Sequence, residues 1–178
     1  MQFDPFAETS NAFLSTKEAT DTLELAALGF GVAHLSYWYV SYLDGLPDDV
    51  TWIATYSPEY MSYYMGKYTP LGDPAFEGSV LGPFVTDWAD IRDADATTRA
   101  IHAQAPRFNI AKHGFSFPFP DRASGTVLFS ANVDCADAQW PARRVALAPQ
   151  IHLYAHHFPR RARSLVAGAV PDWRSSAA

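Results

Sequence analysis

The stretch Tyr56-Ser-Pro-Glu-Tyr-Met-Ser-Tyr-Tyr64, followed by Leu71-Gly-Asp-Pro74, carries the strongest local signals in the chain. Ser57 before Pro58 predicts the start of a helix, with the serine as the N-cap and the proline at the first helical position. Tyr60 and Tyr64 are four residues apart, so they should project from the same side of that helix. We therefore expect a strand that ends at Tyr56 and a helix that crosses it.

Asp73-Pro74 has the same form and predicts a second, short helix with Asp73 in the capping position. This aspartate lies among many aromatic residues, and a buried carboxylate is costly unless it accepts hydrogen bonds. Two interpretations remain open at this point. Asp73 caps its helix while the tyrosines fill the core, or Asp73 and the tyrosines line a binding site.

On the N-terminal side, residues Ala7–Leu28 predict a helix that Gly29 and Gly31 terminate. Two segments rich in β-branched and aromatic residues follow, Val32–Val40 and Val50–Tyr56, separated by the turn sequence Leu43-Asp-Gly45. They predict an antiparallel hairpin, in which Trp52, Ala54 and Tyr56 share one face.

On the C-terminal side, the sequence predicts an extended segment, a helix, a second strand pair and a long final helix. Their ranges are Pro83–Trp88, Asp93–Ala105, Phe115–Phe119, Thr126–Val133 and Trp140–Arg163. The final helix carries an apolar seam and contains Pro149, which predicts a kink. The seam consists of Leu147, Ile151, Tyr154 and Phe158. This order of elements predicts an α+β domain, an α-β-α sandwich with a central antiparallel sheet of about five strands and helices on both faces.

Composition narrows the functional classes. The chain has 178 residues, a formal net charge of −6 and one cysteine. It has no basic run of the kind that contacts nucleic acid and no apolar stretch that would span a membrane. With no disulfide possible within the chain and no secretion signal at its start, we expect a cytoplasmic protein.

No catalytic motif stands out. The sequence lacks a GxSxG nucleophile motif and a glycine-rich phosphate loop, and His152 and His156 have no acidic helix-mate that would complete a zinc motif. We therefore expect no enzyme activity, no metal and no cofactor. A binding site remains, with hydroxyl donors at Tyr56 and Tyr60, an acceptor at Asp73 and a flat wall at Trp88.

The spacing of these residues resembles the autoinducer-binding domain of LuxR-type quorum-sensing regulators, which bind N-acyl-homoserine lactones. That family's motif is Tyr-x3-Trp-x3-Tyr-x8-Asp-Pro, followed by a Trp, a Gly and a Ser or Thr on a late strand. The matching positions here are Tyr56, Tyr60, Tyr64, Asp73-Pro74, Trp88, Gly114 and Ser130. One position departs from the pattern, because Tyr60 stands where the family has the Trp whose indole N–H holds the lactone carbonyl.

The resemblance implies a role for each residue. Asp73 would accept from the amide N–H of the ligand, and Tyr56 would donate to its acyl carbonyl. Ser130 would donate near the same carbonyl or to an oxo substituent, and Trp88 would pack on the lactone. The large rings of Trp38, Trp52 and Phe76 would shorten the acyl pocket, so we expect a short, branched or aromatic acyl group.

The resemblance also implies a domain at 1–165, a tail or linker at 166–178, and a homodimer. Regulators of this family carry a C-terminal helix-turn-helix, and this chain ends before one, so no nucleic acid is expected to bind this chain alone. Two alternatives remain. A truncated homologue would act as an anti-activator through mixed dimers, and a sensor of the GAF or PAS type would bind a small molecule that is not a lactone.

Overall fold

The structure is a computed structural model that describes residues 12–44, 46–68, 73, 76, 85–93, 95–121 and 125–168. Its centre is a five-stranded sheet with the strand order β2-β1-β5-β4-β3, and every neighbouring pair is antiparallel. The strands are β1 (His34–Leu43), β2 (Leu46–Ala54), β3 (Thr86–Asp87), β4 (His113–Asp121) and β5 (Gly125–Val133).

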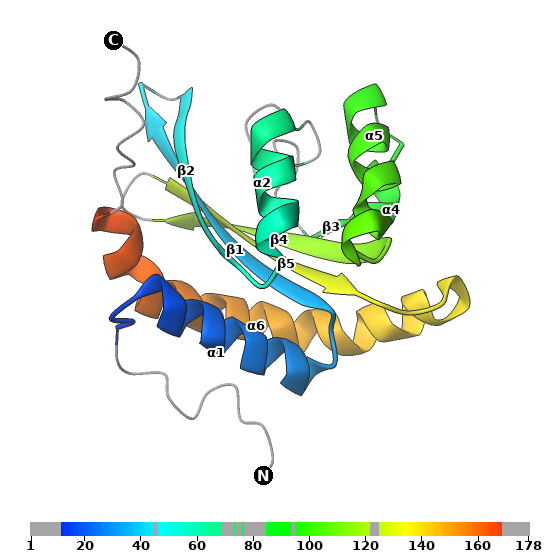
Figure 1. The fold of residues 1–178 in the computed structure, drawn as a ribbon. Helices are drawn as coiled ribbons and strands as arrows, with labels where there is room; N and C mark the ends of the chain where they lie inside the picture. The colour runs from blue at the N-terminus through cyan, green and yellow to red at the C-terminus, as the bar shows by residue number, and fades with distance from the viewer. Residues whose placement is uncertain are drawn as a thin grey trace.

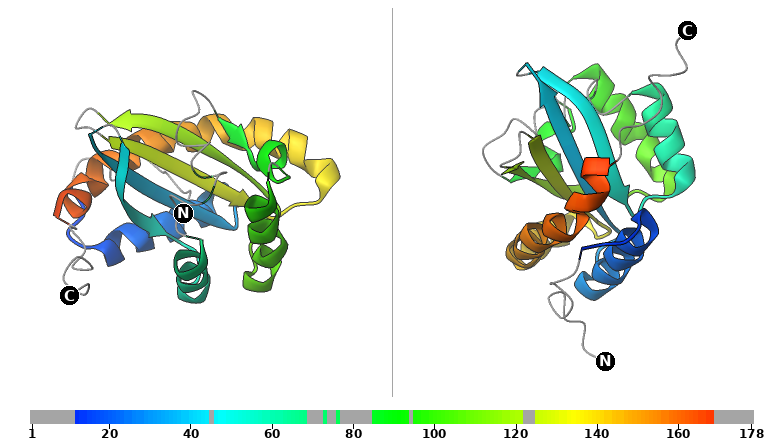
Figure 2. Two further views of the ribbon diagram at one scale, coloured as in Figure 1. Left: turned by 90° about the horizontal axis from the view of Figure 1, so that it is seen from above. Right: turned by 90° about the vertical axis from the view of Figure 1, so that its left-hand side faces the viewer.

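Helices cover both faces of this sheet (Figure 1). One layer consists of α1 (Thr16–Phe30) and α6 (Trp140–Gly168), which lie side by side. The opposite face carries α2 (Pro58–Lys67), α4 (Trp88–Ile91) and α5 (Ala96–Gln104), and Figure 2 shows the same two layers from other sides. Short 3-10 turns follow at η2 (Ala105–Phe108) and η3 (Asp137–Gln139). The predicted α-β-α sandwich is therefore confirmed.

Alternation along the strands creates two separate cores. On β1, Leu35 and Tyr37 face the α1 and α6 layer, whereas Trp38 and Val40 face the other side. Phe115 and Phe117 of β4 are buried in the first core, and the predicted seam of α6 packs there in full. The second core, under α2 and α5, is smaller and is where the candidate site lies.

Several element ends differ from the predicted ones because a neighbouring side chain caps the helix. α1 begins at Thr16, since Ser15 accepts from the backbone N–H of Glu18, and it ends at Phe30, where Gly31 forms the C-cap with a φ of 65°. α5 begins three residues after Asp93, because Asp95 accepts from the N–H of Thr98.

The extended segment predicted before α4 is described from Val85 onwards. Among the residues of that segment that the structure describes, Thr86 and Asp87 pair with β4, and Asp87 then caps α4. The helix expected after Asp73 lies mostly outside the described residues, as do the start of the first predicted helix and the residues after Gly168.

Proline positions fit the architecture. Pro118 was expected near a sheet edge, and it lies on β4, which is next to the edge strand β3 in the strand order. α6 runs through both Pro149 and Pro159 without interruption. No helix in the described part of the chain combines the length and the apolar character needed to cross a lipid bilayer.

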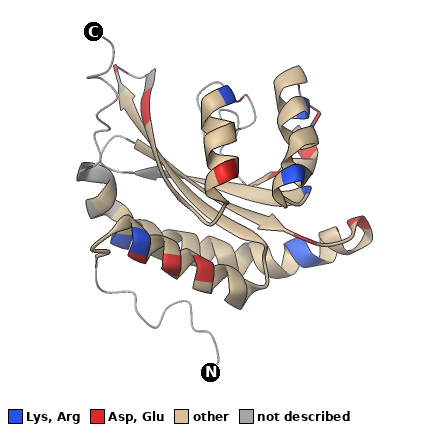
Figure 3. Ribbon diagram, in the orientation of Figure 1, with Lys and Arg blue, Asp and Glu red and all other residues tan. Residues whose placement is uncertain are grey.

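Charge is kept away from the middle of the sheet. Strands β1 and β5 carry no Asp, Glu, Lys or Arg, and Figure 3 shows their ribbons without charged positions.

Candidate ligand-binding pocket

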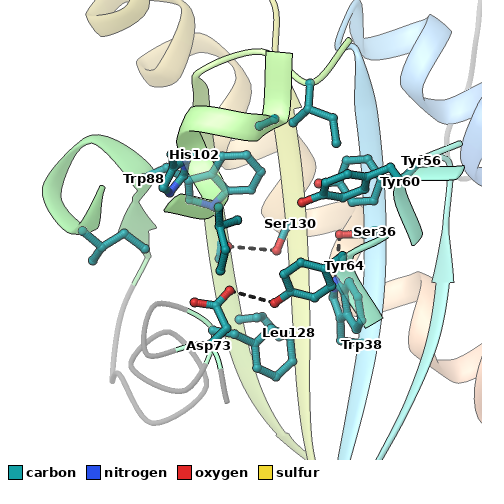
Figure 4. Close-up of a pocket in the computed structure, with 16 residues that line it drawn as sticks. Ser36, Trp38, Tyr56, Tyr60, Tyr64, Asp73, Trp88, His102, Leu128 and Ser130 are labelled. Carbon is teal, nitrogen blue, oxygen red and sulfur yellow. Dashed lines mark hydrogen bonds between the residues drawn. The ribbon is translucent and has the colours of Figure 1, made fainter. Parts of the chain in front are cut away.

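A cavity of about 100 Å³ lies between the sheet and the helices α2, α4 and α5 (Figure 4). Strands β1, β5 and β4 form its floor, and the helices form its walls. All but one of the residues predicted for a ligand site line this cavity. They are Trp38, Tyr56, Tyr60, Tyr64, Asp73, Phe76, Trp88 and Ser130.

Trp52 is the exception, since it is not among the residues that line the cavity. Trp52 pairs with Trp38 across β2 and β1, and the two ring centroids are 6.1 Å apart. Alternation puts both rings on the same face of the sheet, but Trp52 lies one strand further out and is 36% exposed. The outer strand therefore places Trp52 beside Trp38 and away from the cavity.

Tyr60 and Tyr64 lie on helix α2, and Tyr56 lies just before its start. Ser57 caps the helix by accepting from the N–H of Tyr60, as predicted. The rings of Tyr60 and Tyr64 stack with centroids 5.9 Å apart, and the ring of Tyr56 meets Tyr60 edge-on at 5.3 Å. Burial raises the pKa of Tyr56 to about 12 and moves the pKa of Tyr60 in the same direction. At neutral pH these phenols therefore keep their protons and can donate hydrogen bonds.

Asp73 is buried beside these rings, and it is the only carboxylate among the described residues that line the cavity. Its Oδ2 accepts a hydrogen bond of 2.7 Å from the hydroxyl of Tyr64. Burial, and then the negative charge of Asp73, hold the pKa of the Tyr64 phenol well above its usual range. The protein itself therefore supplies a donor to Asp73, and the carboxylate lies in the lining of the cavity.

Polar groups on the floor form a row that the sequence did not reveal. Ser36 of β1 lies opposite Ser130 of β5, and Ser130 lies opposite Ser116 of β4. All three serines are buried and line the cavity. Ser36 and Ser116 were missed because their places depend on the pairing of strands that are far apart in the sequence.

Trp88 is held in place from two sides. Its indole Nε1 donates to Ser116 Oγ at 2.9 Å, and a Cβ on Gly114 would come within 2.5 Å of its ring. The neighbouring Asp87 accepts from the Trp140 indole at 3.0 Å and from Arg144 at 2.7 Å, which ties this wall of the cavity to α6. The glycine that the motif predicts is thus needed for the close approach of the ring.

The remaining lining residues were also missed. The apolar ones are Ile91, Ile101, Ala105, Ile110 and Leu128. His102 of α5 lies near Trp88 with ring centroids 6.3 Å apart, and burial lowers its pKa, so it is neutral at pH 7. Within the described ranges, no three His, Cys, Asp or Glu side chains gather in a way that could hold a metal ion.

The sequence was compared with models of known protein families and with curated proteins. The sequence model of the autoinducer binding domain matches residues 15–162. No curated protein matches the chain.

Solved structures of low sequence identity share the fold. The N-acylhomoserine lactone dependent LuxR-family factor CepR2 from Burkholderia cenocepacia has a TM-score of 0.68 at 21% identity, over 89% of this chain and 92% of CepR2. SdiA from Escherichia coli has a TM-score of 0.69 at 16% identity, over 89% of this chain and 65% of SdiA. A structure of SdiA in complex with octanoyl-rac-glycerol has a TM-score of 0.64 at 14% identity, over 86% of this chain and 61% of that one.

The family model spans most of the chain, and the fold is shared with LuxR-type ligand-binding domains. Six positions of the motif line the cavity, namely Tyr56, Tyr60, Tyr64, Asp73, Trp88 and Ser130. The chain therefore belongs to the autoinducer binding domain family.

Proposed function

We propose that the cavity binds an N-acyl-homoserine lactone or a closely related amide signal. One observation carries this proposal: a buried carboxylate, Asp73, and hydroxyl groups at Tyr56 and Ser130 line the same aromatic cavity. A secondary amide offers one N–H and one carbonyl, and it needs this combination of partners when it leaves water.

The proposed roles follow from these bonding capacities. Asp73 accepts from the amide N–H, and Tyr56 and Ser130 donate to the acyl carbonyl. The ring of Trp88 packs against the lactone. The Tyr60 phenol, which keeps its proton because burial raises its pKa, donates to the lactone carbonyl in place of the family's indole N–H.

The size of the cavity supports a small acyl group. A cavity of roughly 150 Å³ is enough for a benzene-sized guest, and the cavity here is about 100 Å³. The rings of Trp38 and Phe76 pack edge-on at 5.3 Å on its wall. A short, branched or aromatic acyl group therefore requires the least movement of these side chains.

We also propose that the bound signal stabilises the fold and promotes a homodimer in the cytoplasm, as part of a transcription regulator. A guest between the sheet and the upper helices adds apolar contacts that the empty domain lacks, so folding and binding are coupled. At a free concentration 100 times its dissociation constant, a ligand stabilises the folded state by about 2.7 kcal/mol. The dimer is tested by sedimentation with and without the signal.

A thermal-shift panel of lactones tests the binding proposal. Acyl groups of four to twelve carbons, together with branched and benzoyl forms, are added to the wild type, to Asp73→Asn and to Trp52→Phe. Trp52→Phe serves as the control, because Trp52 packs beside the cavity without lining it. We expect short or aromatic lactones to raise the melting temperature of the wild type and of Trp52→Phe, and to raise that of Asp73→Asn much less.

Two results would count against the proposal. If no lactone raises the melting temperature, the domain senses another kind of molecule. If a twelve-carbon lactone binds strongly while the short ones do not, the acyl preference is wrong. Analysis of the recovered lactone by mass spectrometry shows whether it is returned intact, as expected of a receptor, or with an opened ring.

A further inference from the structure

The carboxylate of Asp87 is bonded to two helices that lie on opposite sides of the sheet. Its Oδ1 accepts from the backbone N–H of Ala89 at 2.9 Å and so caps α4. Its Oδ2 accepts from the indole N–H of Trp140 at 3.0 Å and from the guanidinium of Arg144 at 2.7 Å, and both of these residues belong to α6. The two oxygens belong to one planar group, so a displacement of one oxygen displaces the other. A movement of α4 is therefore passed on to the start of α6.

Asp87 and the residue after it face different layers of the molecule. Asp87 lies opposite Phe115 of β4, which is buried in the first core with Trp140. Trp88 instead lines the cavity, where Figure 4 shows its ring, and Figure 1 shows α4 and α6 on opposite sides of the sheet. Neither Trp140 nor Arg144 is among the described residues that line the cavity. The pair Asp87–Trp88 therefore joins the guest side of the sheet to the α6 side.

The elements that carry this pair are too short to hold their own position. β3 has two residues and α4 has four, and a helix of one turn is not stable by itself. Contacts with neighbouring elements therefore decide where Trp88 lies. One such contact is the bond from Trp88 Nε1 to Ser116 Oγ at 2.9 Å on the cavity side. The other contacts are the bonds from α6 to the buried carboxylate of Asp87, and bonds between a buried ion and its donors are among the stronger ones in proteins.

We infer that Asp87 couples the cavity to the start of α6, and that Trp140 and Arg144 are positioning residues for the Trp88 wall of the cavity. The identity of the guest as a lactone rests on the proposed function, and the coupling adds that its binding is reported on the opposite side of the sheet. A coupling between two sites acts equally in both directions. A guest that packs on Trp88 changes the bonds of Asp87 to α6, and loss of those bonds weakens the binding of the guest.

Two neighbouring arginines of α6 provide a matched pair of variants. Arg144→Met removes the bond to Asp87, whereas Arg143→Met removes a bond of 2.7 Å to the carbonyl of Gly31, which follows α1. Isothermal titration uses the lactone that gives the largest thermal shift. We expect Arg144→Met to weaken its binding about five- to tenfold and Arg143→Met to change it less than about twofold. In an Asp87→Ala background, Arg144→Met should have less than about a twofold effect, because its effect passes through Asp87.

The opposite direction is followed by NMR at the indole N–H of Trp140. Addition of the lactone should shift this resonance in the wild type, although Trp140 lies outside the cavity, and should not shift it in Asp87→Ala. A second route between the two sides exists along β4. The ring of Trp140 stacks on His113 at 5.0 Å, and the next residue, Gly114, meets the ring of Trp88. If the lactone still shifts the Trp140 resonance in Asp87→Ala, the coupling runs through β4 and the role of Asp87 is refuted.

A measurement on the free protein separates the coupling from the choice of guest. The indole N–H resonance of Trp88 should move in Arg144→Met and stay in place in Arg143→Met, without any lactone. If no lactone binds but this difference is seen, the coupling stands and the proposed lactone signal is wrong. Equal effects of the two variants on the Trp88 resonance or on lactone affinity would overturn the coupling. Thermal melts confirm that each variant folds, and Trp140→Phe, which removes the other donor, replaces Arg144→Met if that variant does not fold.

Discussion

The hydroxyl of Tyr64 donates to Oδ2 of Asp73 over 2.7 Å, and both groups are buried at the edge of the cavity. This bond joins a residue of α2 to the aspartate nine positions later, so the helix helps to orient a carboxylate that lines the cavity. The donor Tyr64 and the acceptor Asp73 can each be substituted, so the contribution of each residue can be measured on its own.

Tyr64→Phe should destabilise the domain by about 1–3 kcal/mol, because a buried carboxylate loses a donor while the ring stays in place. The measurement is the free energy of unfolding from urea titration in the absence of ligand. Tyr63→Phe is the control, since the Tyr63 hydroxyl contacts Tyr68 near the surface and does not reach Asp73. Equal stability of the two variants would show that the Tyr64 bond contributes nothing.

Asp73→Asn should weaken lactone binding roughly tenfold or more, because a charge-assisted hydrogen bond contributes about 1.5–3 kcal/mol. The asparagine can still accept through its amide oxygen, so the fold should survive. Isothermal titration with the lactone that gives the largest thermal shift measures the change. Unchanged affinity would remove Asp73 from the binding site.

Gly114→Ala should displace the Trp88 ring, since the added Cβ would lie 2.5 Å from it. We expect the Trp88 indole to lose its bond to Ser116 and the affinity for lactone to fall by more than tenfold. The indole N–H resonance in an NMR spectrum, assigned with Trp88→Phe, reports the broken bond directly. Gly66→Ala is the control, because a Cβ there meets no atom within 4 Å. An unmoved Trp88 resonance in Gly114→Ala would contradict the expected displacement.

Asp87→Ala should cost about 2–3 kcal/mol of stability, because the indole N–H of Trp140 and the guanidinium of Arg144 both lose a charged acceptor. The cap of α4 is lost as well. Urea unfolding measures this loss, and Asp90→Ala on the exposed side of α4 is the control. Since Asp87 precedes Trp88, lactone binding should weaken together with stability. A variant as stable as the wild type would show that the link to α6 is not needed.

Stability should fall steeply at alkaline pH. Burial raises the pKa of Tyr56 to about 12, and it raises the pKa values of Tyr60, Tyr64 and Tyr154 in the same direction. An unfolded tyrosine ionises near pH 10, so above that pH the unfolded state releases protons that the folded state keeps. The stabilisation is complete below about pH 10 and is lost as the pH rises through about 12.

Urea unfolding at a series of pH values from 8 to 12 tests this dependence. Within the described part of the chain, the buried hydroxyl of Tyr154 has no hydrogen-bond partner. Tyr154→Phe should therefore cost little at pH 8 and should make the alkaline loss less steep. Stability that stays constant between pH 10 and 12 would show that the tyrosines do not ionise differently in the two states.

Much of the architecture could be predicted because its signals lie close together in the sequence. The N-cap at Ser57, the alternation of Phe115 and Phe117 and the apolar seam of α6 each involve residues a few positions apart. Some predicted ends of elements were wrong. The helix predicted to begin at Asp93 begins at Ala96, because Asp95 is the residue whose backbone and side chain form the N-cap.

The candidate site also has a part that the sequence predicted and a part that it did not. The sequence by itself determined the sandwich of helices and sheet and, through the spacing of the motif, most of the aromatic and acidic lining of the cavity. Only the tertiary structure decided that Ser36, Ser130 and Ser116 form one row and that Trp52 lies outside the cavity. The physical reason is that alternation assigns a side chain to a face of the sheet, whereas the register and order of distant strands assign its position within that face.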